Sequence, residues 1–135
     1  MHLFVADKLK SVGWRAHSGR DFNDADVNTV DFHHMEREKA MEVRVIATLQ
    51  AKAGFEAAVS EAVHEIIEPS RQELGNLQYD LHRDLEKPGV FVFFERWASG
   101  EALDKHNKTA HFQQFVGRLD GKLDTLDIKQ LKQIA

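Results

Sequence analysis

The sequence contains no cysteine. The chain therefore has no disulfide, no thiol nucleophile and no thiolate ligand for a metal, a composition that fits a reducing compartment, and we expect a cytoplasmic protein. Long apolar runs are also missing. The early run LFVA at residues 3–6 is short, and no window approaches the roughly 20 apolar residues of a membrane span. The sequence therefore predicts a soluble protein with no membrane partner.

An excess of positive charge is missing as well. Lys and Arg number 18 against 22 Asp and Glu, for a formal net charge of -4. A surface that binds phosphates usually shows a clustered excess of Lys and Arg, so nucleic acid is not expected as a partner. The chain does have enough hydrophobic residues, 42% of 135, to bury the core of one domain.

The sequence divides near Met41. Residues 1–40 show no sustained hydrophobic period and scatter Gly, Asn and Asp among isolated apolar residues. We interpret them as an N-terminal extension of unclear structure. From Met41 the pattern becomes regular, and residues 41–135 are predicted to form the folded domain.

The first half of this domain reads as a strand followed by a helix. Apolar and polar residues alternate over 42–51, the period of a half-buried strand. Apolar residues from Phe55 to Ile67 then follow the i, i+3, i+4, i+7 spacing of an amphipathic helix. We expect Pro69 to kink its last turns and Gly75 to stop it.

The second half adds a hairpin, an interrupted helix and a last strand. These elements are expected at 76–86, 90–97, 99–119 and 126–134. Leu77 and Tyr79 should share the inner face of the first hairpin strand, while Ser99 and Thr109 should cap the two parts of the helix. The resulting βαββαβ order predicts an α+β, ferredoxin-like fold: a four-stranded antiparallel sheet with two helices on one face.

The strand at 90–97 is apolar on both faces. Val90, Val92 and Phe94 alternate with Phe91, Phe93, Glu95 and Trp97. Helices can cover only one of these faces, and an exposed apolar face of this kind marks an association surface. We therefore expect a homodimer that packs sheet to sheet.

The stretch LGNLQYDLHRDLEKPGVFVFFERWASGEALDKHNKTAHFQQF, residues 74–115, resembles the signature region of the antibiotic biosynthesis monooxygenase domain family. Its specific parts are GNLQY, YxLHRD, a strand ending in ExW, and ALxxH followed by HF. The similarity is greatest to the quinol monooxygenase branch and extends over residues 43 to about 134. The resemblance implies a dimeric α+β barrel and a small aromatic substrate. It also implies oxygenation by dioxygen without metal, flavin or other cofactor.

Two residues of this stretch are candidates for catalysis. A cofactor-free oxygenase needs an apolar pocket and a base that removes a phenolic proton from the substrate. His106 is the candidate base, because the pKa of histidine, near 6.5, is readily tuned. Glu95 shares a strand face with the aromatic residues and could orient a histidine or hold a proton. Its alternative is a structural ion pair with Arg71 or Arg83.

The other candidates would bind the substrate: Trp97, Tyr79, His111, Phe112 and Phe93. Trp97 and Tyr79 could equally serve as core packing. His111 lies five residues beyond His106, about 140° around a continuous helix. The two histidines therefore converge only if a break at 107–109 reorients the second.

No metal site is expected. His33 and His34 are adjacent and would diverge in any regular element, and no HxxxH, HExxH or carboxylate triad spacing occurs. Two functions besides the oxygenase stay open. One is an isomerase or degradative enzyme for a small polar ketone-type metabolite, and the other is a non-catalytic ligand-binding dimer.

Overall fold

A computed structural model describes residues 41–135. The predicted extension, residues 1–40, lies outside the described residues. The elements are β1 (Val43–Ala51), α4 (Glu56–Glu65), α5 (Ile67–Arg71), β2 (Asn76–Arg83), β3 (Val90–Trp97), α6 (Gly100–Asn107), α7 (Ala110–Leu119) and β4 (Leu123–Leu131). The order is the predicted βαββαβ, with each helical connection divided into two segments.

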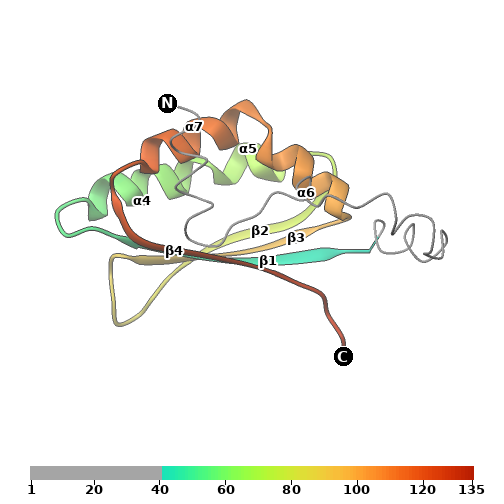
Figure 1. The fold of residues 1–135 in the computed structure, drawn as a ribbon, viewed down its shortest axis with the longest axis horizontal. Helices are drawn as coiled ribbons and strands as arrows, with labels where there is room; N and C mark the ends of the chain where they lie inside the picture. The colour runs from blue at the N-terminus through green and yellow to red at the C-terminus, as the bar shows by residue number, and fades with distance from the viewer. Residues whose placement is uncertain (1–40) are drawn as a thin grey trace, which may run out of the picture.

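The four strands form one antiparallel sheet in the order β2-β3-β1-β4. The four helices of residues 41–135 lie on the same face of this sheet (Figure 1). The ferredoxin-like prediction is therefore confirmed. Alternation in β1 shows why: Val45, Ala47 and Leu49 are buried beneath the helices, while the residues between them are half-buried on the other face.

The helix after β1 breaks where the sequence requires it. Pro69 has no N–H to donate to the carbonyl of Glu65, and α4 ends at that residue. The inner face of α4 is buried as expected through Val59 and Val63. Phe55, predicted on that face, is instead 41% exposed, because it precedes the first turn of α4 as its N-cap residue.

The two parts of the second helix begin at the predicted caps. Ser99 Oγ accepts a hydrogen bond from Ala102 N, and Thr109 Oγ1 accepts one from Phe112 N, each at 3.1 Å. The chain between α6 and α7 thus turns at Lys108 and Thr109. This turn allows α7 to leave the axis of α6.

Gly75 joins α5 to β2 with a φ of +94°, a backbone conformation that favours glycine. A Cβ at this position would lie 2.7 Å from Ala102 Cβ on α6. The carbonyl of Gly75 also accepts a hydrogen bond from Ala98 N at 2.8 Å. The turn that carries Glu73 is therefore held against the start of α6.

Three details of the strands differ from the predictions. β2 ends at Arg83 because Asp84 Oδ1 accepts hydrogen bonds from two backbone N–H groups in the hairpin turn. Leu77 is 49% exposed, because the register of β2 shifts between Asn76 and Gln78. β4 spans 123–131 instead of 126–134, because its partner β1 is fully paired over that range.

The two faces of β3 are both largely apolar, as predicted. Phe91, Phe93, Glu95 and Trp97 are buried against the helices. On the outer face Val92 and Phe94 are half-buried, whereas Val90, predicted to need cover, is already buried. Within residues 41–135 no helix is long and apolar enough to cross a membrane.

Candidate active site

A small pocket lies between α6 and α7 on one side and the inner face of the sheet on the other. Its cavity volume is about 90 Å³. The walls are mainly apolar and include Leu49 from β1, Phe93 from β3 and Phe112 from α7. Ionisable side chains also line it, among them Glu95, His106, Asp120 and Asp124. An apolar pocket with a few convergent polar groups is the usual form of a small-molecule site.

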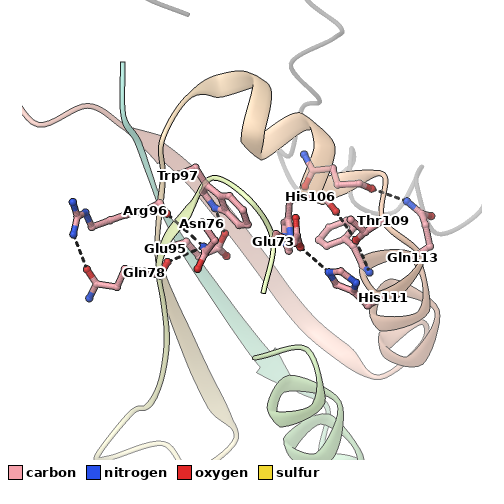
Figure 2. Close-up of polar contacts among 12 residues, drawn as sticks. Glu73, Asn76, Gln78, Glu95, Arg96, Trp97, His106, Thr109, His111 and Gln113 are labelled. Carbon is pink, nitrogen blue, oxygen red and sulfur yellow. Dashed lines mark hydrogen bonds and ion pairs between the residues drawn. The ribbon is translucent and has the colours of Figure 1, made fainter. Parts of the chain in front are cut away.

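Three side chains from separate parts of the chain meet beside this pocket. His106 Nδ1 and His111 Nε2 each lie 2.6 Å from the same oxygen, Glu73 Oε2. Figure 2 shows the Glu73 carboxylate with both imidazoles directed at it. The two imidazole centroids are 6.1 Å apart. The reorientation required for His106 and His111 to converge is therefore present.

Each member of this triad is placed by a local feature of the sequence. His106 lies in the last turn of α6, and His111 lies in the first turn of α7, beyond the cap at Thr109. Glu73 lies in the turn after α5, two residues before Gly75. We call Glu73, His106 and His111 the His–Glu–His triad.

Burial and hydrogen bonding together set the pKa values of His106 and Glu73. Burial lowers the pKa of His106, which is 1% exposed, and the nearby Glu73 only partly opposes this. Burial alone would raise the pKa of Glu73, but the hydrogen bonds and charge of His106 and His111 outweigh it and lower that pKa. The favoured state at neutral pH is thus an ionised Glu73 beside a neutral His106.

This charge state fixes the proton on His106. An ionised carboxylate only accepts hydrogen bonds, so the Nδ1–H of His106 donates to Glu73. The lone pair is then on Nε2, which makes no hydrogen bond within residues 41–135. A neutral imidazole with a free Nε2 at a pocket is arranged to take a proton.

Glu95, in the wall of the pocket, has a raised pKa, whereas the pKa of Glu73 is lowered. Burial raises the pKa of Glu95 to about 7, partly opposed by a hydrogen bond from Trp97 Nε1 at 2.9 Å. The alternative partners expected for it are engaged elsewhere. Arg71 bonds to the carbonyl of Tyr79, and the Arg83 guanidinium lies over the Phe91 ring. The alternative of a structural ion pair with Arg71 or Arg83 is therefore not found, and the hydrogen-bond partner of Glu95 is Trp97.

The predicted aromatic residues surround His106. Its ring centroid lies 4.6 Å from that of Trp97, 5.6 Å from Tyr79 and 5.0 Å from Phe112. Trp97 is fully buried, and burial raises the pKa of Tyr79 far above its usual value. Phe93 packs against Tyr79 at 5.4 Å. The structure therefore brings all seven candidate residues to one region, and Trp97 also fills the core.

Glu73 is the site residue that the sequence analysis missed. It is separated by 33 residues from His106 and by 38 from His111. No spacing rule joins positions so far apart, because their approach depends on the packing of α6 and α7 near the turn at Gly75. The GNLQY segment just after Glu73 was the nearest available signal.

The donor atoms of the triad lie within 4.8 Å of one another, and two histidines with one carboxylate can hold a divalent ion. Ligands of one tetrahedral zinc, each about 2 Å from it, are roughly 3.3 Å apart. The 2.6 Å separations found here are shorter and match charge-assisted hydrogen bonds. The triad as it stands fits a hydrogen-bonded relay better than a metal centre.

Fold and pocket together define a class: ferredoxin-like domains with a small-molecule site between the helices and the sheet. Residues 42–118 match the model of the antibiotic biosynthesis monooxygenase family. The chain belongs to this family, and the resemblance seen in its sequence is confirmed.

Individual relatives agree with this assignment. The chain is 43% identical over 63 residues to "Putative monooxygenase YcnE" of Bacillus subtilis, covering 47% of this chain and 65% of that protein. It is 34% identical over 80 residues to "Putative monooxygenase Rv0793" of Mycobacterium tuberculosis, covering 57% and 78%. The crystal structure of PA3566 from Pseudomonas aeruginosa superposes with a TM-score of 0.68 at 34% identity, over 72% of this chain and 98% of that one.

Proposed function

We propose that the protein is a cofactor-independent monooxygenase that oxidises a quinol or a related electron-rich aromatic with dioxygen, in the cytoplasm. Family membership and the names of the relatives support the reaction type. The pocket supports the substrate class, because its apolar walls include the aromatic rings of Tyr79, Phe93 and Phe112 and its volume of about 90 Å³ favours a small single-ring substrate.

The reaction begins with proton transfer. His106 Nε2 removes the hydroxyl proton of the quinol, and the electron-rich quinolate gives one electron to dioxygen. Superoxide and the substrate radical combine to a hydroperoxide, which loses water. One quinol and one dioxygen thus yield one hydroxyquinone and one water, and the balance requires no other oxidant or reductant.

The remaining residues support this step. Glu73 holds His106 in the tautomer with a free Nε2 and stabilises the imidazolium that forms. Glu95, with its pKa near 7, is able to return a proton to the oxygen that leaves as water. Phe112 forms an aromatic wall of the pocket, and the fully buried Trp97 packs against the His106 ring.

Dimerisation belongs to the same proposal. Val92 and Phe94 form an apolar outer face on a central strand of the sheet. We propose that a second copy covers this face, which would place the two pockets on opposite sides of the assembly.

The observation that carries the function is the buried His106 held by Glu73 at 2.6 Å beside an aromatic pocket. The test is oxygen uptake with a panel of reduced quinones, comparing the unmodified protein with His106→Ala. We expect uptake to fall by about 10²-fold or more, the usual contribution of a general base. His64→Gln, which changes an exposed histidine of α4, is the matched control and should leave uptake unchanged.

Three outcomes would redirect the proposal. Full activity in His106→Ala would remove its role as base. Turnover of a small polar ketone without oxygen would favour the isomerase alternative. Binding of aromatic ligands without turnover under any condition would favour the ligand-binding dimer.

A further inference from the structure

His111 connects the buried triad to the surface. Its Nε2 contacts Glu73, while its side chain is 27% exposed. The same residue lines a second, shallow groove between α7 and the α4–α5 pair, whose walls include Ile66, Pro69 and Arg118. His106 lines the pocket instead and is 1% exposed. Glu73 lies between the two histidines, and its side chain is 12% exposed.

We propose that Glu73 and His111 form a proton relay that carries the proton taken up by His106 from the pocket to the surface groove. This inference rests on the proposed role of His106 as base and extends it. His106 is 1% exposed and packed among aromatic rings, so the proton that it takes up has little direct contact with bulk water. The two 2.6 Å contacts to one carboxylate oxygen join the buried His106 to the partly exposed His111 through ionisable groups.

The proton moves in four transfers, each of which makes one bond to hydrogen and breaks one. His106 Nε2 takes the hydroxyl proton of the substrate, and its Nδ1 proton passes to Glu73 Oε2. Glu73 then passes a proton to His111 Nε2, and His111 releases its Nδ1 proton to water. The net change is one quinolate in the pocket, one proton in solvent and both imidazoles in the opposite tautomer. The reverse sequence supplies a proton when water leaves and restores both tautomers.

The transfer from Glu73 to His111 sets a condition on the tautomer of His111. Its Nε2 must accept a proton, so His111 must be able to adopt the tautomer protonated on Nδ1. Partial exposure of the ring allows water to exchange the tautomers. A buried His111 would be locked as a hydrogen-bond donor to Glu73, and the proton relay would end at the Glu73 carboxylate.

The test uses His111→Gln in the full chain. The glutamine amide can still donate a hydrogen bond to Glu73 but cannot accept and release a proton, so positioning is kept while relay is lost. NMR measures how fast the ring N–H of His106 exchanges with water. We expect exchange to slow by about tenfold or more. His64→Gln is the matched control and should exchange at the unmodified rate.

Oxygen uptake provides the second readout. In His111→Gln, uptake with a quinol should fall by about tenfold in dilute buffer and recover as imidazole is added, because a mobile base replaces the missing relay. The His106 ring N–H should exchange equally slowly in Glu73→Gln. Agreement between the two variants would show that the effect does not come from a local disturbance at position 111. Circular dichroism of both variants establishes that they are folded.

The outcomes separate this inference from the proposed function. Unchanged exchange and unchanged uptake in His111→Gln would overturn the relay and leave His106 as an isolated base. Slow exchange together with no oxygen uptake by the unmodified protein would support the relay and overturn the monooxygenase. Lower uptake that imidazole does not restore would show that His111 only positions Glu73, and this also overturns the relay.

Discussion

The two faces of β3 have the same apolar character but different surroundings. The inner face carries Phe93, Glu95 and Trp97, all buried under the helices next to the pocket. The outer face carries Val92 and Phe94, which are only half-buried in the single chain. Hydrophobicity alone therefore does not distinguish a core position from an association surface. The distinction depends on which element lies above each face.

Neighbouring phenylalanines provide the sharpest test of this comparison. Phe93→Ala should destabilise the fold by about 3 to 5 kcal/mol, because it leaves a cavity among buried side chains. Phe94→Ala, its matched control one residue away, should cost distinctly less in the free energy of unfolding. Chemical denaturation of both variants measures this difference. Equal losses would mean that the outer face is as fully packed as the inner one.

The buried carboxylate on the inner face should make stability depend on pH. The folded pKa of Glu95, about 7, exceeds its unfolded value of 4.5, so folding favours the protonated form. Stability from this group is fully present below pH 4.5 and is lost as the pH rises through 7, by up to about 3 kcal/mol. Glu95→Gln should remove this part of the pH dependence. Denaturation at pH 4.5 and at pH 8 gives the difference between the two proteins, and an identical slope would contradict the raised pKa.

A substitution on the outer face of β3 should weaken dimerisation and leave folding of the single chain intact. Val92→Lys places a charge on the apolar outer face, and we expect it to shift a dimer toward monomer while the unfolding transition remains cooperative. Sedimentation at micromolar concentration measures the mass. Thr48→Ser, on the paired position of β1, is the mild control. A monomeric mass for the unmodified protein would refute the predicted dimer.

The smallest effect is expected from the segment that precedes β1. A protein that begins at Met41 should keep a cooperative thermal transition and the same oligomeric mass, because β1 and its partners β3 and β4 lie entirely within residues 41–135. Loss of cooperativity on this truncation would show that residues 1–40 contribute to the core.

Most of the fold could be predicted from the sequence, because its signals are local. Alternation located β1 and an apolar run located β3, while Ser99 and Thr109 located the starts of α6 and α7. The predictions were wrong where pairing with another strand determines the length of a strand or the exposure of a residue. The length of β4 is set by pairing with β1, and the exposure of Leu77 is set by a register shift against β3.

The site was predictable only in part for the same reason. His106, Trp97 and Phe112 lie within one strand–helix unit, so their types and order were readable. Glu73 comes from an earlier turn, and nothing in its local sequence distinguishes it from other surface glutamates. Its contacts with His106 and His111 exist only after α6 and α7 have packed.

The close approach at Gly75 has a consequence for anyone who wishes to redesign the pocket. A side chain at position 75 would meet Ala102 Cβ at 2.7 Å, so α6 lies too near the preceding turn to leave room for one. Enlarging the pocket by displacing α6 would also draw His106 away from Glu73. Substrate range should therefore be broadened from α7, where Phe112 and Phe115 can be shortened without lengthening the contact on which the base depends.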